Sequence, residues 1–101
     1  MEERIISNIK HVLWYVLAGT KGGPTRIGIL KLLKERPYNS NQLSAVMGMD
    51  YKTIQHHLRV LEENRLITTE DRKYGKMYFV TQLFEQSKDV FEEIMNKVQV
   101  A

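Results

Sequence analysis

The sequence contains no cysteine, which excludes a disulfide framework, an iron–sulfur cluster and a metal site built on thiolates. It also lacks a long hydrophobic run, because the longest apolar stretch, residues 12–18, is far short of the roughly 20 residues that a membrane span needs. The first residues have neither the basic lead nor the small-residue cleavage site of a signal peptide. These absences lead us to expect an intracellular, cytoplasmic protein with no membrane partner.

The size and composition fit one ordinary globular domain. A chain of 101 residues can bury a modest core but is too short for two domains. Hydrophobic residues make up 43% and charged residues 27%, which argues against disorder. The net charge of +3 and the pI near 9.2 weakly favour a polyanionic partner.

The first third of the chain predicts two helices. Apolar residues recur at helical spacing over roughly residues 3–18. The following segment, 19–24, holds three glycines and a proline and should separate this helix from the next. We expect the second helix to start at Pro24, which suits a first helical turn, and to end before Pro37.

The next segment has the pattern of a helix-turn-helix. Polar residues 39–41 are plausible N-caps for a short helix through residues 43–47, and Gly48 lies where that helix should stop. Asp50 can then cap a longer amphipathic helix that runs to about Asn64. A short helix, a tight turn and a longer helix together are typical of this motif.

Beyond the helix-turn-helix, the pattern changes from helical to extended. Segments 66–69 and 77–81 are rich in β-branched and aromatic residues, and a polar turn, 70–76, lies between them. This predicts a two-stranded hairpin, or wing. We therefore expect an α+β, mainly α fold, a winged helix-turn-helix. Its single domain, 1–101, should comprise an N-terminal helix (1–18), a core (24–81) and a C-terminal helix (82–99).

The fourth predicted helix and the wing carry the residues that we expect to contact DNA. On the helix, the side facing away from the apolar residues offers donors for phosphates and base edges. Its members are Tyr51, Lys52, Thr53, Gln55, His56 and Arg59. The turn of the wing is basic, and charge there would favour contact with the DNA backbone or the minor groove. Its members are Arg72, Lys73 and Lys76.

Other polar residues receive a structural interpretation. His57 lies at the edge of the apolar stripe, so we expect it to pack or to form a hydrogen bond at the border of the core. His56 and His57 are not a metal pair, because adjacent helical residues point about 100° apart. His11 is isolated and should be a surface or interface residue. Lys21 and Arg26 are expected to form a helix junction, from which they can reach phosphates at the flank of the duplex.

Residues 22–80 resemble winged-helix regulators of the ArsR-like superfamily, in particular a group common in archaea. The stretches that carry the resemblance are GGPTR (22–26), PYNSNQL (37–43), DYKTIQHHL (50–58), VLEEN (60–64), and Tyr74, Gly75 and Tyr78 in the wing. The resemblance implies a homodimer on a roughly palindromic site, with the fourth helix as the recognition helix. It also implies that Tyr51, Lys52, Thr53, Gln55 and His56 face the DNA.

The sequence departs from the metal-responsive members of that superfamily. They bind metals through cysteines in the helix-turn-helix region or through aspartate, glutamate and histidine on the last helix, where this chain has no histidine. We therefore expect neither a metal nor a cofactor. The sequence names no small-molecule effector.

A dimer needs an interface. The first and last predicted helices carry more apolar surface than a monomer of this size can easily bury. The expected dimer seam comprises Ile5, Ile9, Val12, Leu13 and Trp14 on the first helix, and Phe84, Phe91, Ile94 and Val98 on the last. The alternative is that these stripes close a single core.

The predicted function is sequence-specific binding of double-stranded DNA by a homodimeric transcription regulator, with repression favoured. Three other functions share the same fold: a protein–protein interaction module, a nonspecific chromatin-like DNA binder, and a sensor with a ligand pocket between the dimer helices. Catalysis is not expected, because the acidic pairs 62–63 and 92–93 lie on exposed helix faces and no nucleophile has a motif around it.

Overall fold

The computed structural model describes residues 2–73 and 75–98, with side chains from Asn8 onward. Its first two helices are α1 (Glu2–Ala18) and α2 (Gly23–Glu35), close to the predicted bounds. Pro24 lies in the first turn of α2. No described helix is long and apolar enough to cross a membrane.

The helix-turn-helix forms as the sequence predicts. A short helix, α3 (Ser40–Met47), precedes the longer α4 (Tyr51–Glu63). Asn39 starts α3 with a capping box, in which its side chain accepts from the Gln42 backbone N–H while the Gln42 side chain accepts from the Asn39 N–H. Gly48 ends α3 with a φ of 63°, a conformation that glycine adopts without strain.

The sheet has three strands, whereas the sequence predicts two. Its order is β1-β3-β2, and both pairs are antiparallel. The unpredicted β1 (Tyr38–Asn39) pairs with β3 (Gly75–Val80), with Tyr38 opposite Tyr78. Two residues are too few to show an alternating pattern, so only the fold reveals this strand.

The wing is a longer and tighter hairpin than predicted. β2 spans Ile67–Arg72 and pairs with β3 up to Arg72 opposite Gly75. The prediction that residues 70–76 form a turn is therefore wrong for most of them. The described residues of this segment, 70–73, 75 and 76, are exposed, and the ladder is held by backbone hydrogen bonds, which do not require apolar side chains.

The passage from α4 to the wing is a Schellman turn. The Leu66 N–H donates to the Leu61 carbonyl at 3.0 Å, and the Arg65 N–H donates to the Glu62 carbonyl at 3.0 Å. Arg65 has a φ of 62° and is the one described non-glycine residue with a positive φ. The turn thus uses arginine where glycine is the usual choice.

The C-terminal segment forms two helices, so the prediction of one continuous helix over 82–99 is wrong. They are α5 (Gln82–Glu85) and α6 (Lys88–Val98). Thr81 caps α5 by accepting from the Phe84 N–H, and two turn residues separate α5 from α6. The turn lets Phe84 and Phe91 meet edge to face, with ring centroids 5.0 Å apart.

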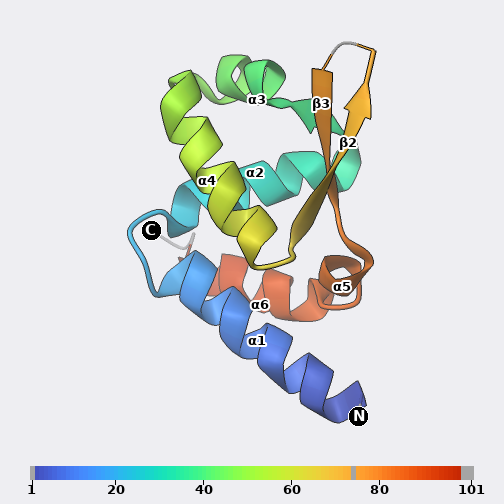
Figure 1. The fold of residues 1–101 in the computed structure, drawn as a ribbon. Helices are drawn as coiled ribbons and strands as arrows, with labels where there is room; N and C mark the ends of the chain where they lie inside the picture. The colour runs from blue at the N-terminus through green and yellow to red at the C-terminus, as the bar shows by residue number, and fades with distance from the viewer. Residues whose placement is uncertain (1, 74, 99–101) are drawn as a thin grey trace.

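The elements form two levels joined by α2 (Figure 1). α3, α4 and the wing lie at the top of the view, α1, α5 and α6 lie at the bottom, and α2 crosses between them. The apolar core runs through both levels. The helix-turn-helix and the wing therefore lie on one side of the core, and the terminal helices α1, α5 and α6 lie on the other.

Much of the predicted dimer seam is instead the core of the single chain. Five of its side chains are at most 4% exposed, so they offer almost no surface to a second copy; they are Ile9, Leu13, Phe84, Phe91 and Ile94. Val12, Trp14 and Val98 are partly buried against that core. The side chain of Ile5 lies outside the described residues. For the five buried residues the seam prediction is corrected, because the stripes of α1 and α6 pack inward.

Candidate nucleic-acid interface

α4 begins at a strong N-cap. The Asp50 carboxylate accepts hydrogen bonds from the backbone N–H groups of Lys52 and Thr53, at 2.9 and 3.3 Å, and from the Thr53 hydroxyl. The Thr53 hydroxyl bond contributes most to holding the pKa of Asp50 below its usual value. Asp50 therefore stays charged and fixes the start of α4. Thr53 is a predicted DNA-facing residue, but here its hydroxyl serves the cap.

The two sides of α4 differ sharply in exposure. Ile54, His57, Leu58 and Leu61 are buried. The other side carries the predicted contact residues, and its exposed members are Tyr51, Lys52, His56 and Arg59. Gln55 is half-buried at the border. The described chain thus leaves the polar side of α4 uncovered, which a helix that enters a groove requires.

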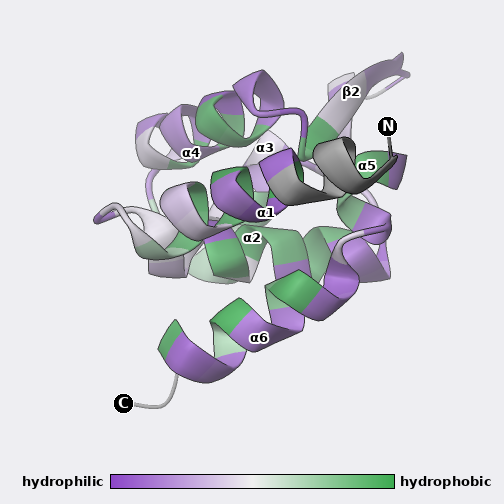
Figure 2. Cartoon of the chain, turned by 90° about the horizontal axis from the view of Figure 1, so that it is seen from below, coloured by the Kyte–Doolittle hydropathy of each residue, from purple (hydrophilic) through white to green (hydrophobic). Residues whose placement is uncertain are grey.

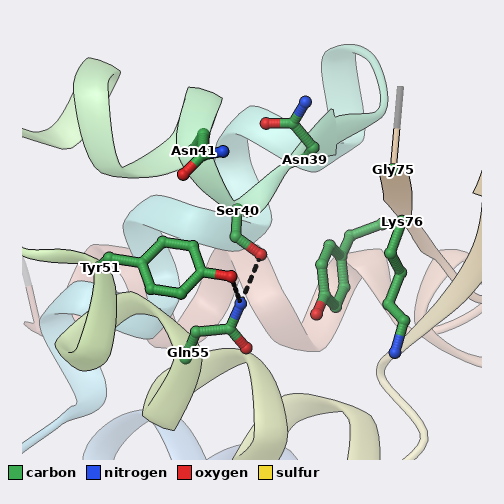
Figure 3. A pocket seen from close by; sticks show the side chains of 8 residues that line it. Asn39, Ser40, Asn41, Tyr51, Gln55, Gly75 and Lys76 are labelled. Atoms are coloured by element: carbon green, nitrogen blue, oxygen red, sulfur yellow. Dashed lines mark hydrogen bonds between the residues drawn. The ribbon is translucent and has the colours of Figure 1, made fainter.

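A polar pocket joins α4 to the start of α3 and to the wing (Figure 3). It is lined by Asn39, Ser40, Asn41, Tyr51, Gln55, Gly75, Lys76 and Tyr78, with a volume of 280 Å³. Gln55 Nε2 lies 2.8 Å from both Ser40 Oγ and Tyr51 Oη. The pocket brings together three predicted contact residues, Tyr51, Gln55 and Lys76. From the sequence, residues 39–41 are expected only as helix caps; the fold adds them to the same surface as α4.

The basic residues of the wing differ in their surroundings. Arg72 pairs with Glu70 at 3.1 Å, and both side chains are more than half exposed. Its guanidinium also lies 5.4 Å from the centre of the Phe79 ring. Lys73 and Lys76 are exposed. Of these three cations, Lys76 alone lines the pocket beside α4. Tyr74, which carries part of the family resemblance, lies outside the described residues.

Arg26 is a buried core residue, so the prediction that it reaches phosphate is wrong. It is 6% exposed, and its guanidinium donates to His57 Nδ1 at 3.2 Å, the Val16 carbonyl at 3.1 Å and the Thr20 hydroxyl at 2.8 Å. Burial lowers the pKa of Arg26. These bonds tie the end of α1 and the start of α2 to the inner side of α4.

His57 meets the expectation of a hydrogen-bonded residue at the core border. It is 8% exposed and accepts the Arg26 bond with a neutral ring nitrogen. Burial, followed by the charges of Arg26 and His56, lowers the pKa of His57. The neutral form is therefore the one that fits this packing.

Gly22 and Gly23 stand where neighbouring groups leave no room for a side chain. A Cβ on Gly22 would lie 2.7 Å from both the Arg26 guanidinium and the His57 ring, and a Cβ on Gly23 would lie 2.0 Å from the Leu17 carbonyl oxygen. Both glycines permit close approach of packed groups. They belong to the helix junction, in agreement with the sequence analysis.

The described side chains include no group of three or more histidine, cysteine, aspartate or glutamate residues that could hold a metal ion. The chemistry that this surface offers is hydrogen bonding and positive charge, supplied by α4, the start of α3 and the wing.

Comparison with known proteins gives a family match over the same elements. Residues 23–69 match the model of the bacterial regulatory protein arsR family. No curated protein sequence matches the chain.

Solved structures share the fold. A transcriptional regulator homologue from Pyrococcus horikoshii OT3 is 25% identical, with 88% of this chain and 94% of that chain covered and a TM-score of 0.64. A possible transcriptional regulator for arsenical resistance is 27% identical over 88% of this chain and 95% of that chain, with a TM-score of 0.64. The transcriptional repressor BigR from Xylella fastidiosa covers all of this chain and 96% of its own at 20% identity, with a TM-score of 0.71.

The family match begins at α2, includes the whole helix-turn-helix and reaches the first residues of the wing. It thus contains the uncovered side of α4 and the junction that supports it. The archaeal subgroup expected from the sequence stays a prediction. Residues 23–69, which include the helix-turn-helix, match the bacterial regulatory protein arsR family, and the whole chain has the winged helix-turn-helix fold of the transcriptional regulators compared above.

Proposed function

We propose that two copies of the chain bind a two-fold-symmetric operator, with α4 of each copy in the major groove and each wing on the backbone or in the minor groove. The observation that carries this proposal is the exposure of Lys52, His56 and Arg59 on the side of α4 that the protein leaves uncovered. In this arrangement the half-sites lie about one helical turn apart, roughly 34–36 Å.

The contacts fall into two classes in this proposal. Gln55 and His56 read base edges, because their side chains can match donors and acceptors in the major groove. Lys52, Arg59 and the wing cations Arg72, Lys73 and Lys76 neutralise phosphates, which sets affinity rather than sequence preference. Tyr51 borders the pocket at 49% exposure and orients Gln55.

The proposed dimer interface uses the outer parts of α1 and α6. Hydrophobic segments lie beside polar ones on both helices when the molecule is seen from below (Figure 2). The partly buried apolar residues there are Val12, Trp14, Val90, Met95 and Val98, and Tyr15 is 68% exposed. Three of the residues predicted for the seam, Val12, Trp14 and Val98, remain in this set.

We propose repression as the regulatory outcome and the cytoplasm as its location. A small dimer that covers its operator excludes other proteins from the same DNA, which suffices to block transcription. Effectors are not part of the proposal.

Selection of bound sequences from a random DNA pool tests the function, followed by a gel-shift titration with the selected and a scrambled duplex. We expect a palindromic site and a preference of at least about 10³-fold for it. Equal binding to both duplexes would instead support a nonspecific chromatin-like binder. No binding at low salt would support a protein–protein module.

Base reading is tested with Gln55→Ala and His56→Ala. Each should weaken the selected site by about 1–3 kcal/mol and leave scrambled DNA nearly unaffected. An equal loss on both duplexes would contradict base reading by that residue.

The dimer is tested by sedimentation with Val98→Asp, which places a charge in the proposed interface. The matched control is Asn96→Asp, because Asn96 is exposed on the same helix. We expect monomers for the first variant and dimers for the second. Dimers for both would rule out the α6 part of the interface.

A further inference from the structure

The Gln55 side chain is held from two sides by hydroxyl groups (Figure 3). Its Nε2 donates to Ser40 Oγ and to Tyr51 Oη, each at 2.8 Å. A glutamine amide has two N–H donors, so these two bonds use both of them. The remaining hydrogen-bonding group is the carbonyl oxygen Oε1, which lies on the side of the amide away from the hydroxyls.

Both hydroxyls belong to residues at the capped start of a helix. Ser40 is 8% exposed and is the first residue of α3, directly after the Asn39–Gln42 capping box. Tyr51 is the first residue of α4, directly after the Asp50 cap, and lies one helical turn before Gln55. Because both helix starts are fixed by their caps, the two hydroxyls form a clamp, Ser40 and Tyr51, that bridges both helices of the helix-turn-helix.

The clamp changes what Gln55 can recognise. An unrestrained glutamine pairs with adenine through its oxygen and its N–H group together, accepting from N6 and donating to N7. With its nitrogen occupied, Gln55 offers an acceptor alone. In the major groove, the base groups that donate are adenine N6 and cytosine N4, whereas guanine and thymine present acceptors there.

We propose that Ser40 and Tyr51 are positioning residues that make Gln55 a reader of base amino groups. At one position of each half-site, adenine and cytosine then bind comparably, and guanine and thymine are disfavoured. This inference rests on the proposed binding of α4 in the major groove and defines the specificity of that contact.

The experiment uses the selected operator, with all four base pairs placed in turn at each half-site position. Dissociation constants are measured for the wild-type protein, Gln55→Ala, Tyr51→Phe, and the double variant Ser40→Ala/Tyr51→Phe. Ser87→Ala serves as the matched control, because it removes another buried hydroxyl at the turn between α5 and α6. Thermal melting checks that each variant is folded.

For the wild type we expect one position where adenine and cytosine differ by less than about threefold and exceed guanine and thymine by about tenfold. Gln55→Ala should abolish this preference. The double variant frees the amide nitrogen, so adenine should gain about tenfold over cytosine at that position. Tyr51→Phe, which keeps the ring and spares the buried serine, should move the ratio in the same direction. Ser87→Ala should leave it unchanged.

Three results would overturn the inference. A wild-type preference for guanine or thymine at the Gln55-dependent position would mean that the nitrogen, not the oxygen, faces the DNA. A strong preference for adenine over cytosine that the clamp variants leave unchanged would mean that the hydroxyls do not set the specificity. Specific binding with no position sensitive to Gln55→Ala would remove Gln55 from base reading, while the proposed function itself would stand.

Discussion

His56 and His57 are neighbours on α4 whose ring centroids lie 5.2 Å apart, yet their surroundings differ. His56 is exposed beside Lys52 and Arg59, whereas His57 is buried and accepts a hydrogen bond from Arg26. One residue along a helix rotates the side chain by about 100°, which is enough to move the same imidazole from solvent to the core border. The inner side of α4 therefore packs on the junction of α1 and α2, while the outer side stays free for the DNA contact that we propose.

The comparison also shows why the junction is built from glycines and a buried arginine. Gly22 and Arg26 let the inner side of α4 approach the chain closely where α1 ends, and Gly23 lets the start of α2 pack directly on Leu17 of α1. Changes on this side should alter folding. Changes on the outer side should alter DNA binding and leave the free energy of unfolding within about 0.5 kcal/mol.

The largest effect is expected for Gly23→Ala. Its Cβ would lie 2.0 Å from the Leu17 carbonyl oxygen, a backbone atom that cannot move without displacing α1. We expect the free energy of unfolding, measured by urea denaturation, to fall by about 3 kcal/mol or more. The control is Gly28→Ala, whose Cβ would meet only the flexible end of Met47 at 3.0 Å. Equal losses for both variants would contradict the conclusion that close packing against Leu17 requires glycine at position 23.

The next effect is a pH dependence that separates the two histidines. Because the pKa of His57 is lowered in the folded protein, the unfolded chain binds the proton more tightly. The contribution of His57 to stability is therefore complete above its unfolded pKa of about 6.5 and is lost as the pH falls from there toward the lowered folded pKa. The loss is at most about 1.4 kcal/mol per pH unit.

Urea titrations at a series of pH values measure this dependence. His57→Gln keeps a side chain that can accept a hydrogen bond but does not titrate, so it should flatten the curve below pH of about 6.5. The charge of His56 is the smallest of the three causes that lower the pKa of His57, so His56→Gln should flatten the curve less than His57→Gln does. A greater flattening with His56→Gln would reverse the assignment of the two sides.

A smaller effect tests the outer side without disturbing the fold. Lys76 lines the pocket beside Gln55, and its removal should lower the slope of log affinity against log salt concentration by about 0.9 if it neutralises one phosphate. Lys88→Ala is the control, because Lys88 is exposed at the start of α6, on the far side of the core. An unchanged slope for Lys76→Ala would remove this part of the wing, next to its turn, from the contact surface.

The smallest effect lies where α4 turns into the wing. Arg65 has a φ of 62°, which costs a non-glycine residue about 1–2 kcal/mol, while glycine loses about 0.5–1 kcal/mol more entropy on folding. Arg65→Gly should therefore raise the free energy of unfolding by about 0.5 kcal/mol, as measured by urea denaturation. A decrease would mean that the Arg65 side chain contributes packing that outweighs the backbone strain.

Local rules predicted the helices up to the wing well. Gly48 and Asp50 act at the positions where the sequence places them, and the helical periodicity locates α1, α2, α3 and α4. These features depend on residues within a few positions of one another, so a single segment of sequence contains their cause. The exposure of Lys52, His56 and Arg59 followed from the same periodicity.

Three of the wrong predictions involve partners that are distant in the chain. β1 exists because Tyr38 lies opposite Tyr78, and Arg26 is buried because His57 and Val16 accept its hydrogen bonds. The apolar stripes of α1 and α6 looked like a dimer seam because periodicity gives the direction of a stripe but not what it packs against.

The sequence by itself determined the order and type of the helices, their caps and the polar side of α4, since each follows from the spacing of nearby residues. Only the tertiary structure decided which stripes close the core, that Ser40 and Tyr51 hold Gln55, and that Arg26 pairs with His57. The Arg26–His57 hydrogen bond joins residues 31 positions apart, and the core joins α1 to α6; the packing of whole elements, rather than local preference, brings such residues together.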